Sequence, residues 1–200
     1  KKVERDLDFD DEWHGREGRI PVRRIFSDQW PSYVHGIAKA LEAQGIDYLE
    51  DQNGAFRDGY FPVTMSNLYD RRVSAAIGYL DPATRQRENL RIEAETQVKE
   101  ILFEGTKAVG VVAVQRGQEH TFKANEVILC SGAIHSPAML LRAGIGPVGH
   151  LHDMGIDVRV ERAGVGQNLM EHAAAAMSAW MQPDARLNDL TRRHIHLGWR

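Results

Sequence analysis

The sequence predicts an α/β chain that contains both helices and strands, with one section forming an antiparallel β-meander. Apolar residues recur every three to four positions over residues 27–45 and 69–82, the spacing of amphipathic helices. Between residues 89 and 130 the period falls to two and β-branched residues become frequent, which is typical of strands. The last of these strands, Glu126–Cys130, is apolar after its first residue and leads into a further helical pattern. This order of elements predicts a mixed fold with a sheet at its centre.

The composition is that of an ordinary folded domain and excludes several kinds of function. The 200 residues are 42% hydrophobic and 26% charged, with a formal net charge of -3. That charge gives no basic surface for phosphates, so no nucleic-acid partner is expected. A single cysteine excludes an internal disulfide and a CxxC zinc site, and no metal is expected. No apolar run reaches the ~18 residues of a membrane span, and a cytoplasmic location is the default expectation.

The first 69 residues predict one long helix between irregular stretches. A glycine-bearing loop is expected to enter a short strand near residues 20–22. The helix of residues 27–45 should begin at Ser27 or Asp28 and end at Gly45. Five apolar residues share one of its faces: Trp30, Val34, Ile37, Ala38 and Leu41. Residues 47–69 lack a sustained period and predict an irregular loop.

The middle of the chain predicts a second helix and then the meander. Pro82 should close the helix of residues 69–82. Turn signals at Gly105-Thr106 and Arg116-Gly117 divide the next stretch into three antiparallel strands. The fourth strand, Glu126–Cys130, should be covered on both faces, as in the middle of a parallel sheet. Cys130 would then be a buried thiol that acts as a small apolar residue.

The residues after this strand form a cluster suited to close approach by a ligand. Ser131-Gly132-Ala133 place three small residues at the carboxyl end of the strand. Ser136-Pro137 then predict a helix start, and Gly144 to Pro147 its end. A short helix ending at Gly155 and a strand over 156–161 should follow. A glycine turn at 164–166 leaves Asn168 as another possible helix start.

Three stretches together resemble one protein family. They are GAIHSPAMLLRAGIGP (132–147), GVGQNLMEH (164–172) and WHGREGRIPV (13–22). The first resembles the second signature of the glucose-methanol-choline (GMC) family of flavin oxidoreductases, with Ala143 where that family usually has serine. The second resembles Gly-Val-Gly-x-Asn-Leu-x-Asp-His, with Glu171 in place of the aspartate. The resemblance runs from Trp13 to His172.

The resemblance implies a partial FAD/NAD(P)-binding Rossmann-like domain and the start of a substrate-binding domain. The expected division is residues 1–84 as flanking loops and helices, 85–172 as the FAD-binding portion and 173–200 as the start of the substrate domain. The GxGxxG at 144–149 ends the helix of the second signature, whereas the flavin fingerprint that the family carries on its first strand, and its catalytic histidine, lie in regions with no counterpart here. An internal fragment is therefore expected, without catalytic residues of its own. By itself it should neither bind FAD tightly nor oxidise an alcohol.

The implied activity is oxidation of a small-molecule alcohol by hydride transfer to FAD, with the electron acceptor left open. Two alternatives are a family member that works as a lyase with a structural flavin, and a non-catalytic binding module. A lyase would leave its flavin oxidised when it meets an alcohol. A binding module would have an exposed apolar patch and no room for a dinucleotide.

Six residues are candidates for cofactor contact. Val98 corresponds by resemblance to the family valine whose main chain pairs with adenine. The alternative is that Val98 is an ordinary strand valine without a role in binding. The small residues Ser131, Gly132 and Ala133 fit either close approach to the adenosine half of FAD or tight packing. Asn168 and His172 lie in a segment that, according to the resemblance, runs back toward the cofactor. A structural role is the alternative for both.

The remaining reactive-looking residues have ordinary explanations. His150 and His152 are two apart on a short helix and therefore face different ways, as expected of surface histidines. His194 and His196 would share a strand face, but no carboxylate or cysteine completes a metal site. His135 holds a variable position of the family signature and receives no catalytic role. Residues 10–12, Asp-Asp-Glu, predict a solvated acidic run.

Overall fold

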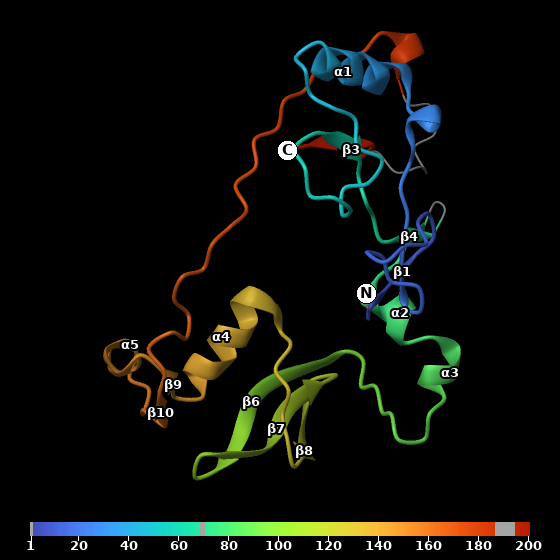
Figure 1. Ribbon diagram of the computed structural model, residues 1–200. Coiled ribbons are helices and arrows are strands. Elements are labelled where there is room, and N and C mark those ends of the chain that lie inside the picture. Colours follow the sequence, from blue (N-terminus) through green and yellow to red (C-terminus); the bar gives the residue numbers. More distant parts are fainter. Residues whose placement is uncertain (1, 69–70, 187–194) are drawn as a thin grey trace. The chain divides into compact units, whose positions relative to one another are not determined.

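The computed structural model describes residues 2–68, 71–186 and 195–200, which fall into two units (Figure 1). Unit 1 consists of Lys1–Leu90 and Met177–Arg200, and unit 2 of Arg91–Ala176. Each has its own sheet elements and packing. They are therefore described separately.

Unit 1 is built from short paired strands. Strand β1 (Glu4–Asp6) runs parallel to β2 (Ile20–Val22), which confirms the strand predicted after the glycine loop. Strand β3 (Tyr60–Pro62) pairs antiparallel with β11 (Leu197–Trp199), and β4 (Asn67–Leu68) with β5 (Arg71–Arg72). The prediction of an irregular loop over 47–69 was therefore wrong for β3 and β4. Because the partner of β3 lies more than a hundred residues away, local periodicity could not reveal this pairing.

The helix expected over residues 27–45 is shorter than predicted. A 3-10 turn, η1 (Ser27–Gln29), comes first, and α1 (Ser32–Glu42) begins only after Pro31. A proline keeps the residue before it extended, and Trp30 accordingly has φ -74° and ψ 141°. The start at Ser27 or Asp28 was therefore wrong. The end is confirmed: Gly45 has φ +78°, the left-handed conformation that commonly terminates helices.

The core of unit 1 lies under α1. Its buried members are Trp30, Val34, Ala38, Leu41 and Tyr60. The indole Nε1 of Trp30 donates to the carbonyl of Ile25 at 2.7 Å, which satisfies its polar atom. Ile37, predicted on the same face, is 43% exposed and lies at the margin of the core. The predicted apolar face of α1 is thus confirmed except at its edge.

The second predicted helix, over residues 69–82, is shorter than expected, and residues 71–72 of that range form strand β5 instead. Helix α2 (Ala75–Tyr79) starts at Ser74, whose hydroxyl accepts from the backbone N–H of Ile77. Pro82 does not merely close it, because it is the first residue of α3 (Pro82–Arg85). Asp81 caps α3 by accepting from the N–H of Thr84 at 2.8 Å. Short 3-10 helix η2 (Pro183–Ala185) completes unit 1.

Unit 2 contains the predicted meander. Strands β6 (Thr96–Glu104), β7 (Lys107–Gln115) and β8 (Gln118–Lys123) form an antiparallel sheet in that order. The turns fall at residues 105–106 and 116–117. Gly105 and Gly117 both have positive φ there, which explains the glycines. The prediction of three strands with these two turns is confirmed.

The fourth predicted strand is absent from the described part of the chain. Residues 126–130 follow β8 in an extended course toward the next helix but pair with no strand (Figure 1). Val127 and Leu129 are half-buried, whereas Ile128 is 78% exposed, so only one side is covered. The prediction of a strand covered on both faces was wrong, because a strand requires a hydrogen-bonding neighbour. Cys130 is exposed rather than buried for the same reason.

Helix α4 (Gly132–Arg142) starts earlier than Ser136-Pro137 suggested. The Ser136 hydroxyl accepts from the backbone N–H of Ser131 at 3.0 Å, reaching back across the first turn. Pro137 therefore lies inside the helix, near its exposed start, where water can donate to the Ala133 carbonyl that the missing N–H leaves without a partner. The predicted end is confirmed at Gly144, with φ +75°. A Cβ there would lie 2.3 Å from the Asp157 carbonyl, so no other residue fits.

After α4, unit 2 contains two short strands joined by a helix. Strand β9 (Ile145–Gly146) pairs parallel with β10 (Val160–Glu161), and α5 (Val148–Asp153) connects them. The short helix ending at Gly155 is confirmed, whereas the strand predicted over 156–161 is reduced to two residues. Beyond the glycine turn, residues 168–182 form no helix or strand, so the helix start predicted at Asn168 was wrong. No helix in the described ranges combines the length and the apolar character needed to cross a bilayer.

Candidate cofactor site

Val98 lies on an edge of the meander. Among the described residues its strand, β6, is hydrogen-bonded to β7 on one side only, which leaves backbone N–H and C=O groups on the other side. Val98 pairs with Ala113, and the register then shifts before Glu100, which leaves Lys99 as an extra residue. The Val98 side chain is 37% exposed. The site therefore offers main-chain donors and acceptors beside a local irregularity, a common feature of binding sites.

The charge of the extra residue is engaged within the sheet. The Lys99 ammonium contacts the carboxylate of Glu119 on β8. The hydrogen bond to Glu119 is the largest of the effects that raise the pKa of Lys99 above its ordinary value. The ammonium group is thus committed to the sheet.

Ser131, Gly132 and Ala133 lie together at the start of α4 and are all exposed. Gly132 has φ +81°. A Cβ built on it would meet no atom within 4 Å, so the space above it is open. An open backbone at a helix start is the arrangement that lets a ligand approach main-chain N–H groups.

The last two candidates lie beyond α5. Asn168 has φ +55°, which asparagine tolerates better than most residues, and its side chain is exposed. His172 is exposed in the extended segment that follows, and its backbone N–H donates to the carboxylate of Glu171 at 2.9 Å. All six candidates belong to unit 2, but no hydrogen bond among the described residues joins Val98, the Ser131–Ala133 turn and Asn168 to one another. Their role in cofactor contact stays a prediction.

A hollow of about 230 Å³ lies between β6 and the end of α4. Phe103, Arg142 and Arg159 are among the residues that line it. The Arg159 guanidinium stacks over the Phe103 ring at 4.7 Å and donates to the Gly105 carbonyl at 3.0 Å. Because drug-sized ligands occupy roughly 300–1,000 Å³, this hollow is too small to enclose a dinucleotide.

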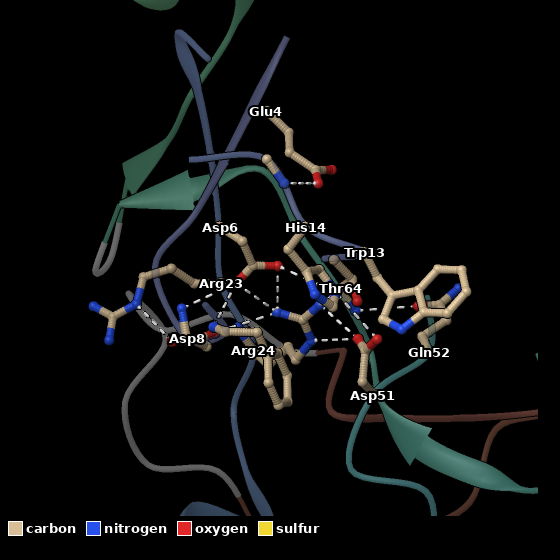
Figure 2. Close-up of polar contacts among 12 residues, drawn as sticks. Glu4, Asp6, Asp8, Trp13, His14, Arg23, Arg24, Asp51, Gln52 and Thr64 are labelled. Atoms are coloured by element: carbon tan, nitrogen blue, oxygen red, sulfur yellow. Dashed lines mark hydrogen bonds and ion pairs between the residues drawn. The ribbon is translucent and has the colours of Figure 1, made fainter. Parts of the chain in front are cut away.

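Unit 1 holds a buried ionic cluster that the sequence alone did not reveal (Figure 2). We call it the Arg24 cluster; its members are Asp6, Asp8, Asp11, His14, Arg23, Arg24 and Asp51. The pairing of β1 with β2 brings the segment that carries Asp6 and Asp8 beside the segment that carries Arg23 and Arg24. Asp51 comes from the loop before β3. Burial of charges is costly unless they are paired, so this cluster must be closely matched.

Arg24 is the centre of the cluster. Its Nε and Nη2 donate to Oδ1 of Asp51 at 3.0 and 2.6 Å, and its Nη1 donates to both oxygens of Asp6. The backbone N–H of Arg24 also donates to Asp8 at 2.6 Å. The ring of Phe9 covers the guanidinium at 4.6 Å. Arg24 therefore connects the N-terminal segment to the loop at Asp51.

The acidic run at residues 10–12 is only partly solvated. Asp10 and Glu12 are exposed, as predicted, but Asp11 is half-buried and accepts from His14 Nδ1 at 2.7 Å. Desolvation is the largest single effect on Asp11, but hydrogen bonds from His14 and the Trp13 backbone outweigh it and lower the pKa of its carboxyl. The one sequence signal for the cluster was His14 itself, in the WHGREGRIPV stretch.

The other histidines are arranged as follows. His150 and His152 are exposed on α5, as expected, and His135 is exposed on α4. His196 is buried, whereas His194 lies outside the described residues. Within the described ranges, no group of three or more His, Cys, Asp or Glu side chains is arranged so that it could hold a metal ion.

Comparison with known sequences identifies the family. The sequence model described as GMC oxidoreductase matches residues 1–174, most of the chain. The chain belongs to the GMC oxidoreductase family. The resemblance read from residues 13–172 is thereby confirmed, and with it membership of a family of flavoproteins.

GMC relatives match nearly the whole chain. A 5-(hydroxymethyl)furfural oxidase of Methylovorus sp. (strain MP688) is 44% identical over 192 residues, 95% of this chain and 36% of that protein. The mitochondrial choline dehydrogenase of Homo sapiens is 45% identical over 161 residues, 80% of this chain and 27% of that protein. The chain thus spans about a third of the length of its relatives.

Solved GMC structures share the fold. The crystal structure of pyridoxine 4-oxidase from Mesorbium loti superimposes with a TM-score of 0.73 at 30% identity, over 80% of this chain and 31% of that chain. Formate oxidase superimposes with a TM-score of 0.75 at 26% identity, over 86% of this chain and 31% of that chain. The mixed α/β fold class is therefore confirmed. The division into 1–84, 85–172 and 173–200 stays a prediction beside the two units seen here.

Proposed function

We propose that this chain forms part of an FAD-dependent enzyme that oxidises the CH–OH group of a small alcohol to an aldehyde or ketone. The observation that carries the proposal is the match of the GMC family over residues 1–174, together with relatives named as alcohol oxidases and dehydrogenases. No observation favours the lyase or the binding module.

The residues of unit 2 fit the adenosine half of FAD. Adenine is recognised through donors and acceptors on its edge, and the free side of β6 at Val98 offers both kinds of backbone group. The open backbone at Gly132, with its neighbours Ser131 and Ala133, supports close approach of the ribose or pyrophosphate. Asn168 and His172, both exposed, are proposed as further contacts.

This chain is proposed to bind and orient the cofactor, not to carry out proton transfer. When bound, FAD supplies the hydride acceptor for the alcohol carbon. No histidine of the described residues is placed beside Val98 or Gly132 by a hydrogen bond, so none is assigned as the base. The proposed partners are a small alcohol and an electron acceptor of open identity.

The test is anaerobic mixing of the flavin-loaded protein with 5-(hydroxymethyl)furfural and, separately, with choline, the molecules in the relatives' names. Loss of the oxidised-flavin absorbance with either alcohol, together with formation of the carbonyl product, is the expected result. A flavin that stays oxidised while the alcohol is consumed would identify a lyase instead. The 200 residues alone are not expected to hold FAD tightly, so it is failure of the whole enzyme to retain a flavin that would contradict the proposal.

A further inference from the structure

The ring of His14 lies inside the Arg24 cluster and is surrounded by charged groups (Figure 2). Its side chain is 3% exposed. Carboxylates approach it from three elements: Asp6 from β1, Asp11 from its own loop and Asp51 from the loop before β3. Arg24 is the cation that faces it, with Nη2 3.5 Å from Nε2. The imidazole is thus a buried titratable group on which the proposed oxidation does not depend.

The contacts of Nδ1 require a proton on that nitrogen. Nδ1 is 2.7 Å from Oδ1 of Asp11. The same oxygen already accepts from the backbone N–H groups of Trp13 and His14, at 2.8 and 3.2 Å. A carboxylate with a lowered pKa is an acceptor only, so His14 must donate from Nδ1.

The contacts of Nε2 favour a second proton. Nε2 is 3.1 Å from Oδ2 of Asp51 and 3.8 Å from Oδ2 of Asp6. A neutral Nε2 would direct its lone pair at the nearer carboxylate, which is repulsive. It would gain in exchange only a 3.5 Å contact with the Arg24 guanidinium, at the outer limit for a hydrogen bond. A protonated Nε2 donates to Asp51 instead, and charge-assisted hydrogen bonds of this kind are the strong ones.

We propose that His14 is held in its doubly protonated form and acts as a pH-sensitive latch between residues 1–24 and the loop at Asp51. Three carboxylates face the ring against one guanidinium, so the local charge balance favours the imidazolium. Arg24 already ties the same two segments together, and His14 adds a second link that depends on a proton. Loss of that proton places a lone pair against Asp51 and weakens the link.

The sign of the pH effect follows from proton binding. Above about pH 6.5 an imidazole in the unfolded chain is largely neutral, whereas His14 in the folded protein still holds its second proton. The folded state then binds more protons than the unfolded state, so stability falls as the pH rises. The contribution of the latch is complete at lower pH and disappears once the folded protein releases the proton.

The direct test is nuclear magnetic resonance of the protein with ¹⁵N-labelled histidine rings at about pH 8, where a free imidazole is mostly neutral. We expect both ring nitrogens of His14 to be protonated. The ring of the exposed His150 on α5 provides the internal comparison in the same spectrum. A His14 ring with one protonated nitrogen at this pH would overturn the proposal.

A second test measures unfolding by urea between about pH 6 and about pH 8. Wild-type protein should show an unfolding equilibrium constant that rises on the order of tenfold over this range, because the unfolded chain releases a proton that the folded protein retains. His14→Gln should reduce that rise to about twofold or less, whereas the control His150→Gln should retain it. A rise of the same size in His14→Gln would contradict the latch, and if that variant does not fold, the ring measurement on wild-type protein decides.

Discussion

Arg24 and Asp6 form an ion pair in which neither side chain is accessible to solvent. Nη1 of Arg24 lies 3.0 and 2.9 Å from the two oxygens of Asp6. Two charges taken out of water are stable only while they remain paired, because the desolvation cost stays when one partner is removed. The pair therefore contributes more to specifying the arrangement of β1 and the segment after β2 than an exposed pair of the same length.

Arg24→Met should destabilise the protein by about 3–5 kcal/mol, since it leaves Asp6 and Asp51 charged and buried without their shared cation. The matched control is Arg19→Met. Arg19 also pairs with an aspartate, Asp81, at 3.0 Å, but both side chains are largely exposed, so the loss should stay below about 1 kcal/mol. Urea unfolding of both variants measures the difference. Equal losses would contradict the burial argument.

Tyr60 is held by a short hydrogen bond at the edge of the unit 1 core. Its hydroxyl donates to Glu42 of α1 at 2.5 Å, and the residue is 3% exposed. Burial, followed by the bond to Glu42, raises the pKa of Tyr60 to about 12. Tyr60→Phe should cost about 1 kcal/mol at neutral pH through the lost hydrogen bond. Tyr79→Phe is the control, because Tyr79 is exposed and should tolerate the change.

The same tyrosine predicts a loss of stability in alkali. The unfolded chain releases the Tyr60 proton near its ordinary pKa of 10.0, whereas the folded protein retains it up to about 12. The folded state binds more protons over this window, so stability falls as the pH rises through it. Ultraviolet titration of tyrosinate should show a tyrosine that ionises at about pH 12 and is absent from Tyr60→Phe. A tyrosinate titration that Tyr60→Phe leaves unchanged at its alkaline end would be the contrary result.

The sequence predicted those parts of the fold in which local signals are sufficient. The meander was found with its turns because glycines at 105 and 117 mark reversals between alternating strands. The prediction of a strand over residues 126–130 was wrong, because an apolar run does not indicate whether a neighbouring strand is present to pair with it. Strand β3 was missed for the related reason that its partner, β11, is remote in the chain.

The same distinction applies to the two sites. Val98 and the turn at 131–133 were named from a family signature whose residues are close together in sequence. The Arg24 cluster was missed because its members, such as Asp6, Arg24 and Asp51, are far apart and look like ordinary charged surface residues. Only their burial makes them distinctive, and burial depends on tertiary structure.

Cys130 should react readily with a thiol reagent in the folded 200-residue chain. It is the single cysteine and is exposed at the end of the unpaired segment 126–130. We expect one equivalent of an aromatic disulfide to be consumed, with a rate that urea increases by about threefold or less, because unfolding exposes little more of it. Cys130→Ser should consume none. Labelling that occurs only after unfolding would show that this segment is covered.

Gly132 provides the sharpest test of the proposed cofactor site. Gly132→Ala should cost about 1 kcal/mol of stability, because alanine is strained at φ +81°, while its Cβ meets no protein atom within 4 Å. Gly155→Ala is the matched control, since Gly155 has φ +67° and equally open surroundings in the same unit. Both variants should lose similar stability in urea. If FAD approaches the backbone at Gly132, only Gly132→Ala should also raise the FAD dissociation constant of the whole enzyme, on the order of tenfold, as expected for about 1.4 kcal/mol of lost binding. Equal FAD affinity in the two variants would remove the Ser131–Ala133 turn from the site.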